Sequence, residues 1–346
     1  MLYMEIYLVL TLLTIIIRNR KAEFIFFNIA FLLLFTFVTF RWQVGCDFYS
    51  YKNQYEIKYA NIHIEDALSD REPGYTLAIF LLQSISADWS WMNVLSAVAF
   101  FSGLYALARR QPNPLYFLTL CYPVLILTLS TSAIRQAAAA GFIYLAGSAY
   151  IEKRVFLYLS LVLIASTFHR SAFVFIVFAP LLVSADIRVK IIAGLSGVVL
   201  TSLLADPSEM LQGYSAAYIG SGLDAQGGAY RVLPVFIAGC IYIFSRKRWS
   251  EKYPREAAFL NVMFIPMVLT LPVVFISTVI GDRFNYYLMP AAFMVFGRMQ
   301  LLAARGSTFL FAAPLVGSFF ELGVWLLYSI IVQACFTPYQ SWLDVM

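Results

Sequence analysis

Charged side chains are scarce in this sequence. Only 12% of its 346 residues are Asp, Glu, Lys or Arg, whereas 61% are hydrophobic, and a soluble domain carries about 25% charged residues. This deficit excludes a soluble fold, because a globule of this length cannot bury so much apolar surface. The net charge of +5 does not indicate a nucleic-acid partner. The positions of the basic residues along the chain are informative instead, because they indicate how the chain is oriented in a membrane.

Histidine and cysteine are scarce as well. The chain has two histidines and four cysteines, and no two cysteines form a CxxC pair. We interpret the cysteines as small apolar side chains, with no disulfide and no metal site. No metal and no cofactor are therefore predicted. The cysteines are Cys46, Cys121, Cys240 and Cys335.

Long apolar runs fill the rest of the chain. About 20 apolar residues cross the hydrocarbon core of a bilayer, and inside it the backbone must satisfy its own hydrogen bonds, which favours helices. The sequence predicts an all-α, polytopic membrane protein, a single transmembrane domain over 1–346 with about twelve helical segments. We place them near 3–17, 24–40, 89–107, 115–131, 134–151, 155–168, 171–184, 189–205, 231–245, 256–280, 284–300 and 308–332.

Two features of these runs need separate interpretation. The run 3–17 follows no basic stretch and precedes no cleavage motif, so we expect a retained span rather than a signal peptide. The run Tyr75–Ile85 is too short to cross a bilayer comfortably. We expect it to form an interfacial or re-entrant helix.

The basic residues divide between alternate loops. Sixteen of the 24 Lys and Arg lie in one set of loops, which the positive-inside rule places in the cytoplasm. The termini, a loop over 41–88 with amphipathic helices, and a Gly-rich loop over 206–230 then face outward. Both histidines, His63 and His169, fall on that outer side. The Gly-rich loop is interpreted either as a gate or as a plain connection.

Three candidate proton acceptors lie at the outer ends of the apolar runs. His169 stands beside Arg170 and Ser171, and an unperturbed pKa near 6.5 suits a histidine for proton transfer; the alternative is a structural histidine. Asp47 either caps a helix or points into a site. Glu72 precedes Pro73-Gly74, which predicts a turn, and is either a site residue or a solvated carboxylate.

Arg135 is the most distinctive basic residue. It follows Ser130-Thr131-Ser132 between two apolar runs, with no acidic residue nearby in the sequence. A charge at membrane depth is functional by default, although an Arg at a helix end can also extend to the surface. The planar guanidinium group binds a diphosphate through paired hydrogen bonds. Further candidates for this role are Arg41, Arg231 and Arg283, the last of which could alternatively pair with Asp282.

Tyrosines recur every four residues at Tyr51, Tyr55 and Tyr59. This spacing places them on one face of a helix. The face is expected to lie in the membrane interface, where tyrosine is favoured. The alternative is a surface that stacks against sugar rings.

Taken in order, these residues form a string that resembles the EpsG family of bacterial membrane proteins, which are similar to Wzy-type exopolysaccharide and O-antigen polymerases. The resemblance covers about residues 1–300. The string reads Arg41-x3-Gly45-x-Asp47-x3-Tyr51, Glu72-Pro73-Gly74-Tyr75, Ile134-Arg135-Gln136, Phe168-His169-x-Ser171-Ala172 and Arg283-x2-Tyr286.

The resemblance implies a GT-C-like glycosyltransferase of the bacterial inner membrane, with its site facing the periplasm or exterior. It would join repeat units carried on undecaprenyl diphosphate, and a chain-length regulator is an expected partner. The expected bases are His169, ranked first, then Asp47 and Glu72. Arg135, Arg283, Arg41 and Arg231 would bind the diphosphate, supported by Gln136, Tyr51, Tyr75, Ser171 and Tyr286.

Three other functions stay open at this point. An O-antigen ligase would use nearly the same site. An integral acyltransferase also uses a histidine and an arginine at the membrane. A glycolipid transporter or flippase predicts charges near the midplane and internal repeats; the charges here lie at outer span ends, and the sequence shows no clear repeat. The sugars, the linkage and its stereochemistry are not predicted.

Overall fold

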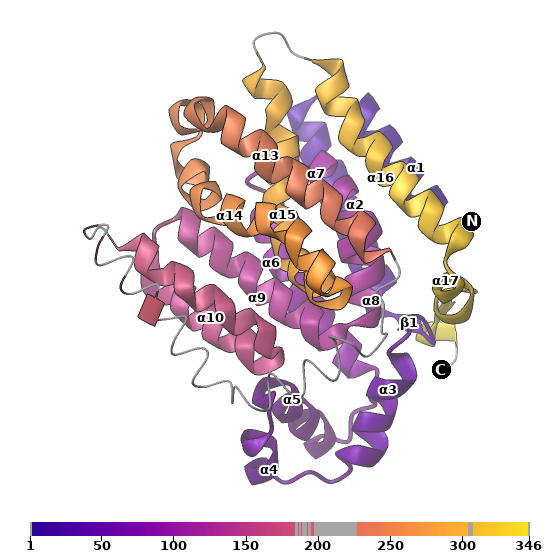
Figure 1. Ribbon diagram of the computed structural model, residues 1–346. Helices are drawn as coiled ribbons and strands as arrows, with labels where there is room; N and C mark the ends of the chain where they lie inside the picture. Colours follow the sequence, from indigo (N-terminus) through magenta and orange to yellow (C-terminus); the bar gives the residue numbers. More distant parts are fainter. Residues whose placement is uncertain are drawn as a thin grey trace.

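The computed structural model describes residues 2–183, 227–303 and 307–344, with isolated positions 186, 188, 192, 195 and 196. The predicted segment 189–205 and nearly all of the Gly-rich loop 206–230 lie outside this description. The described chain is almost entirely helical (Figure 1). Its first half holds α1 (Leu2–Ile16), α2 (Arg20–Thr39), α3 (Phe48–Asn53), α4 (Ile64–Ser69), α5 (Pro73–Ser84), α6 (Trp91–Ala108), α7 (Pro114–Cys121), α8 (Ser130–Ser132), α9 (Ile134–Ile151) and α10 (Val155–Phe168).

The second half continues the same architecture. A 3₁₀ helix covers Arg170–Leu182, and π-helical turns cover Gln54–Lys58 and Tyr122–Leu129. The later α-helices are α13 (Gly228–Lys252), α14 (Pro254–Ile276), α15 (Thr278–Leu302), α16 (Thr308–Tyr328) and α17 (Ile330–Cys335). Two short strands, β1 (Arg41–Trp42) and β2 (Gln340–Ser341), pair antiparallel, and a 3₁₀ turn at Trp342–Asp344 ends the described chain.

Six of the described helices are long and apolar enough to cross a membrane. They are α2, α6, the continuous helix Pro114–Ser132, α13, α14 and α16, and shorter apolar helices cover Leu2–Ile16, Val155–Phe168 and Arg170–Leu182. The predicted class, an all-α membrane protein, is therefore confirmed. The number of twelve membrane segments and the GT-C-like plan stay predictions.

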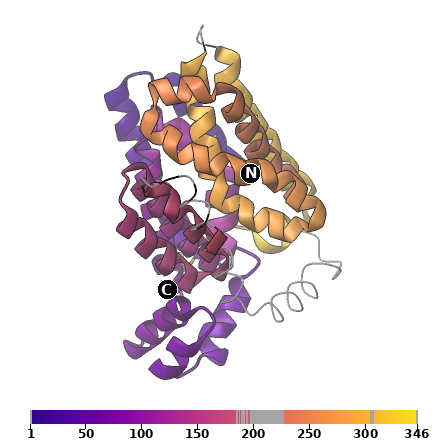
Figure 2. The ribbon, with the colours of Figure 1, turned by 60° about the vertical axis from the view of Figure 1, so that its left-hand side comes forward.

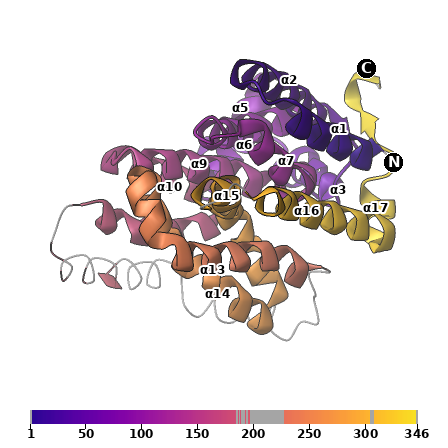
Figure 3. The same cartoon turned by 90° about the horizontal axis from the view of Figure 1, so that it is seen from above.

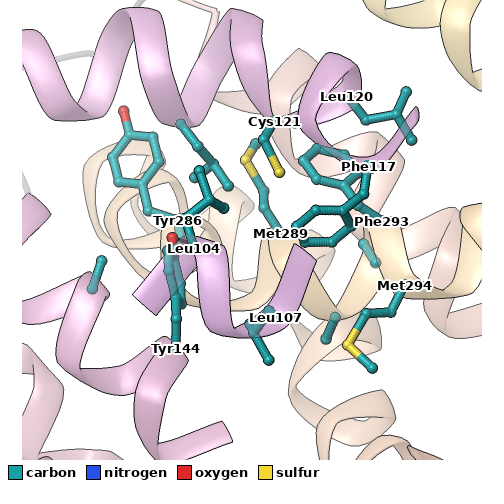
Figure 4. Packing of buried hydrophobic residues seen from close by; sticks show 14 of the residues in the cluster. Leu104, Leu107, Phe117, Leu120, Cys121, Tyr144, Tyr286, Met289, Phe293 and Met294 are labelled. Atoms are coloured by element: carbon teal, nitrogen blue, oxygen red, sulfur yellow. Dashed lines mark hydrogen bonds between the residues drawn. The ribbon is translucent and has the colours of Figure 1, made fainter. Parts of the chain in front are cut away.

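Glycine allows the two most closely packed helices to touch. A Cβ atom built at Gly103 of α6 would lie 1.9 Å from the carbonyl oxygen of Gly141, and one at Gly141 of α9 would lie 2.1 Å from that of Ala99. Small residues at such crossings let helix backbones approach closely in a membrane. Around this crossing, α6, α7, α9 and α15 build the main core (Figure 4), to which Leu104, Leu107, Phe117, Cys121, Tyr144, Met289 and Phe293 contribute.

The loop 41–88 folds into a small layer of its own at one end of the bundle. Its short helices α3, α4 and α5, coloured purple, lie together in Figures 1 and 2. Tyr51 and Tyr55 are each only 6% exposed and pack with Tyr75 and Trp89. The interfacial and sugar-stacking interpretations of the tyrosine face are therefore wrong for these two rings, because the face turns inward and forms the core of this layer.

The C-terminal segment returns to the same layer. The disulfide Cys46–Cys335 joins residues 289 positions apart, with Cα atoms separated by 4.8 Å. The Tyr339 ring stacks on Phe37, with centroids 4.3 Å apart. The prediction that all four cysteines are unpaired apolar residues is thus wrong for this pair, since tertiary structure brings together two cysteines that no local spacing connects. Disulfides persist in oxidising compartments, which supports the outward placement of 41–88.

The disulfide gives a test of topology. In right-side-out membrane vesicles we expect Cys46 and Cys335 to resist a membrane-impermeant maleimide until a reductant is added, and then to be labelled from outside. Cys121 is buried and should stay unlabelled. A Cys46→Ser/Cys335→Ser variant is the control for background labelling. Labelling of the oxidised protein, or labelling only in inverted vesicles, would contradict this arrangement.

The glycine crossing gives a test of packing. Gly141→Ala should lower the thermal unfolding temperature, because the new methyl group meets the Ala99 backbone and α6 and α9 must separate, at a cost of about 1–3 kcal/mol. Gly317→Ala in α16 is the matched control, since a Cβ atom there has nothing within 4 Å. The control should keep or raise stability, by up to ~1 kcal/mol. Equal unfolding temperatures for the two variants would refute this view of the crossing.

Candidate functional site

Glu72 binds one residue of α9 and one residue between two helices, at the end of the bundle that carries the 41–88 layer. Its Oε1 atom lies 2.7 Å from His169 Nδ1, and its Oε2 atom accepts a hydrogen bond from Arg135 Nη1 at 2.7 Å. The backbone N–H of Arg170 also donates to Oε1, at 3.4 Å. Glu72 is only 8% exposed. Glu72, Arg135 and His169 are called the Glu72 cluster below.

Local sequence explains the position of the Glu72 carboxylate. Pro73 begins α5, so Glu72 occupies the N-cap position, but its side chain makes no capping bond and reaches away to other helices. The turn predicted at Glu72-Pro73-Gly74 is instead the first turn of a helix, where proline is well tolerated. Gly74 allows close packing, because a Cβ atom there would lie 2.3 Å from the Thr167 hydroxyl oxygen.

Breaks in helices present the two partners of Glu72. His169 is extended (φ −154°, ψ 118°) between α10 and the 3₁₀ helix that follows. Arg135 is the second residue of α9, directly after a break at Ala133 (φ −97°, ψ 68°). Both residues therefore follow interruptions between helical segments. Non-helical backbone at membrane depth is tolerated where it is buried in protein or lines a cavity, and both breaks serve to aim a polar side chain.

Two tyrosine rings flank Arg135. Its guanidinium carbon lies 5.6 Å from the ring centre of Tyr51 and 5.3 Å from that of Tyr75. The negative faces of aromatic rings attract cations, most strongly where water is excluded. The Arg135 side chain keeps 35% of its surface exposed. The rings and Glu72 therefore fix its position while part of the guanidinium group stays accessible.

Neighbouring charges counteract the effect of burial on the pKa values of two carboxylates, Glu72 and Asp47. Burial alone would raise the pKa of Glu72, but the hydrogen bond and charge of His169, the charge of Arg135 and the Arg170 N–H together hold that pKa below its ordinary value. For Asp47 burial prevails and its pKa is raised, although Arg283 and Arg135 act in the opposite direction. The surroundings of Glu72 therefore favour its ionised form, whereas burial disfavours the ionised form of Asp47.

Two buried donors near Glu72 lack a partner within the described chain. The Tyr75 hydroxyl and Arg135 Nε are both buried, and neither makes a hydrogen bond there. Buried polar groups are nearly always paired, so each such exception needs an explanation. Donors left unpaired beside a partly exposed arginine are suited to an anionic or hydroxyl-rich ligand.

The start of α15 lies beside the start of α9. Gln136 Nε2 donates to the backbone oxygen of Arg283 at 2.7 Å, and Arg283 itself is exposed. Its charge acts on Asp47. Asp47 precedes α3 without capping it through its side chain, so the predicted side-chain cap is not formed. Asp47 and Arg283 thus belong to the surroundings of the Glu72 cluster.

A second buried ion pair lies on the other side of the same α15 turn. Arg231 donates through Nε and Nη2 to the two oxygens of Asp282, at 2.7 and 2.9 Å, and Tyr286 donates to Asp282 at 2.9 Å. Asp282 therefore pairs with Arg231 rather than with Arg283, the partner that the sequence offered as an alternative. Ser171, predicted as a supporting residue, forms a hydrogen bond with the hydroxyl of Tyr287, at 2.9 Å.

Arg41 is predicted to bind the diphosphate, but the structure places its side chain outside the Glu72 cluster. It is 2% exposed, and its guanidinium donates to the backbone oxygens of Thr131 and Val38 and to the Asn93 side chain, at 2.9, 2.6 and 2.9 Å. A buried guanidinium whose nitrogens are already bound to protein cannot also bind a diphosphate. Its place here is to join the end of α2 to the end of α8.

The structure thus unites Glu72, His169, Arg135, Tyr51 and Tyr75, and separates Arg41 and Arg231 from them. Sequence analysis did not single out Glu321, a lone acid inside the apolar run 308–332. The rule that found Arg135 would have found it as well. In the described part of the chain, no three His, Cys, Asp or Glu side chains gather as a metal site requires.

Six long apolar helices, with a cluster of charged side chains at one end of the bundle, define a multi-pass membrane protein. The chain belongs to the EpsG family, whose model matches residues 24–341. This is a family of glycosyltransferase-type polymerases, so the protein is a membrane protein of the polysaccharide-polymerase type. Comparisons with curated proteins and with solved structures gave no significant match.

The lowered pKa of Glu72 gives a test by pH. A carboxylate whose folded-state pKa is depressed stabilises the fold above its ordinary pKa, near 4.3, and this contribution is lost as pH falls through the folded-state value. Glu72→Gln should therefore lower stability at pH 7 by about 1–3 kcal/mol and weaken the loss of stability on acidification. Thermal unfolding measured at pH 7 and then from pH ~5 down to pH ~2 covers both effects, because the loss lies below the ordinary pKa.

Glu65→Gln is the control for this measurement, because Glu65 is an exposed acid in α4 of the same layer. It should leave both the unfolding temperature and its pH dependence unchanged. If Glu72→Gln and Glu65→Gln behave alike, Glu72 does not hold the cluster together.

Proposed function

We propose that this protein is a glycosyltransferase that polymerises oligosaccharide repeat units carried on undecaprenyl diphosphate, at the outer face of the bacterial inner membrane. The observation that carries the proposal is the Glu72 cluster, which places a histidine and an arginine on the two oxygens of one buried carboxylate. Family membership supports the class of reaction. The cluster supports the mechanism.

The hydrogen bond that His169 donates to Glu72 determines how His169 can act. A carboxylate beside Nδ1 favours the tautomer with the proton on Nδ1, which leaves Nε2 as the proton acceptor. Within the described chain Nε2 has no hydrogen-bond partner, so it is available to a substrate hydroxyl. His169 is therefore the proposed base, and Glu72 orients it and stabilises the imidazolium that forms.

The proposed reaction forms one bond and breaks one. A hydroxyl oxygen of the acceptor repeat unit attacks the anomeric carbon of the growing chain while its proton passes to His169 Nε2. The bond between that carbon and the diphosphate oxygen breaks, and the lipid diphosphate leaves as an anion. Negative charge accumulates on the leaving group, and positioned positive charge stabilises it.

Arg135 and Arg283 are the proposed ligands of the leaving diphosphate. Arg135 is held by Glu72 through Nη1 but keeps an accessible surface and an unpaired Nε. Arg283 is exposed at the start of α15, next to Gln136 and Asp47. Arg41 and Arg231 are not part of this proposed set, because protein acceptors already bind them.

The two histidines provide a matched test. His169→Ala should abolish polymer in the producing strain and leave single lipid-linked repeats, since loss of a general base costs about 10²–10⁴-fold in rate. His63→Ala should leave the glycan profile unchanged, because His63 is exposed and lies outside the cluster. Arg135→Ala should match His169→Ala, and Arg135→Lys should restore little, because lysine lacks the planar fork.

The glycan profile also separates the alternatives. Polymer of normal length in the His169 and Arg135 variants would refute the proposed site. Full-length polymer that accumulates on its lipid carrier, with none transferred onward, would indicate a ligase instead. Protein levels in the membrane fraction should be equal across the variants, so that loss of folding is not read as loss of catalysis.

A further inference from the structure

A groove of about 620 Å³ runs along the outer half of the protein between α13 and α16, with the π-helical turn around Pro123 as part of its wall. Both helices pack against α15, as the view along the bundle shows (Figure 3). The α16 part of its lining extends from Gly317 to Ser329, about 18 Å of helix axis at ~1.5 Å per residue. The groove therefore covers more than half of a hydrocarbon core about 30 Å thick.

The lining is mostly apolar and opens sideways. Leu233 and Ile237 of α13 are 41% and 47% exposed, and Phe320 and Val324 of α16 are 63% and 51% exposed. These side chains face outward at membrane depth, where they contact hydrocarbon chains. A lipid chain can therefore enter the groove from the bilayer without crossing protein.

Gly317 gives the groove its depth. It lies inside α16, where glycine costs about 1 kcal/mol relative to alanine. A Cβ atom at this position would meet nothing within 4 Å, so no neighbouring helix requires the glycine. Its effect is to leave open space in the wall of the groove.

Two charged residues also line the groove. They are Arg231 of α13 and Glu321 of α16, and Glu321 has one buried carboxylate oxygen without a partner in the described chain. Charged groups at membrane depth are costly and mark substrate paths. Apolar lining residues lie on both sides of Glu321 along α16, so it is Arg231, in the first turn of α13, that marks the polar end of the groove.

The polar end of the groove connects directly to the candidate site. Arg231 binds Asp282, the residue before Arg283, and its backbone oxygen accepts from Asn285 at 2.7 Å. The Arg283 backbone oxygen in turn accepts from Gln136, next to Arg135. One turn of α15 thus contacts Arg231, which lines the groove, and Gln136, the neighbour of Arg135 in the Glu72 cluster.

We propose that this groove binds the polyprenyl chain of a lipid-linked substrate, holding the part nearest the diphosphate and directing that diphosphate over the start of α15 toward Arg283 and Arg135. This inference rests on the proposed function. The continuity with the Glu72 cluster favours a polyprenyl diphosphate over an ordinary phospholipid, whose headgroup has no role at that cluster. The single apolar channel also fits one chain rather than two.

Photolabelling of the full-length protein tests the groove. The probe is a polyprenyl diphosphate with a diazirine near its diphosphate end, added to protein in vesicles of phosphatidylethanolamine and phosphatidylglycerol. Labels should map by mass spectrometry to 230–237 and 317–328. Gly317→Trp should reduce this labelling at least ~10-fold, equivalent to about 1.4 kcal/mol of binding, because the indole ring fills the open space.

Leu327→Trp is the matched control, since Leu327 lies on the same helix, is 76% exposed and does not line the groove. It should keep full labelling. Unchanged labelling of Gly317→Trp, or labels spread evenly over exposed positions such as Leu32 and Leu33 of α2, would overturn the proposal. So would equal labelling by a diazirine phosphatidylglycerol that competes with the polyprenyl probe, because the groove would then be an ordinary lipid site.

Two further results separate this inference from the proposed function. His169→Ala should keep groove labelling while losing polymer, since the histidine acts on the sugar and not on the chain. If His169→Ala and Arg135→Ala lose polymer but the groove takes no label, only the groove assignment fails. If both variants polymerise normally, the proposed function fails, whatever the labelling shows.

Discussion

The carboxylate of Glu72 is the interaction on which the outer end of the protein depends. It is buried, and it holds His169 on one oxygen and Arg135 on the other. These bonds join the start of α5 to the break after α10 and to the start of α9. Breaking a buried ion pair by removing one partner leaves an uncompensated charge, which is strongly destabilising. The same bonds orient the groups that the proposed chemistry uses.

The bilayer determines where such an arrangement can form. Within hydrocarbon a helix must satisfy its own backbone, so polar side chains can converge only where helices end or break inside protein. In this protein Arg135, His169 and the neighbouring residues Asp282 and Arg283 lie at or after the breaks at Ala133, His169 and Ser277. Glycines at the α6–α9 crossing and at Gly74 bring those ends close together. The packing of the helices therefore also determines the geometry of the site.

Four arginines of the outer side have separate tasks, although they look alike in the sequence. Arg41 bonds helix ends to one another, and Arg231 neutralises Asp282 beside the groove. Arg135 lies between two tyrosine rings with part of its surface accessible, and Arg283 is exposed near Asp47. Burial distinguishes these arginines. The Arg41 guanidinium is 2% exposed and bound to three protein oxygens, so a ligand cannot reach it, whereas Arg135 keeps 35% of its side-chain surface exposed.

The sequence by itself determined the membrane class, the helical architecture and most helix positions, and it singled out Glu72, Arg135 and His169, which the structure brings into contact. These follow from local quantities: length of apolar run, side-chain type, and the cost of a charge in hydrocarbon. Only the tertiary structure decided that Cys46 reaches Cys335, that Tyr51 and Tyr55 face inward, that Arg41 is structural, and that Glu321 borders a groove. Each of these depends on contacts between segments far apart in the chain, which residue spacing does not encode. Which side chain meets which is decided when the helices pack, because burial leaves each polar group only the partners that the fold brings within reach.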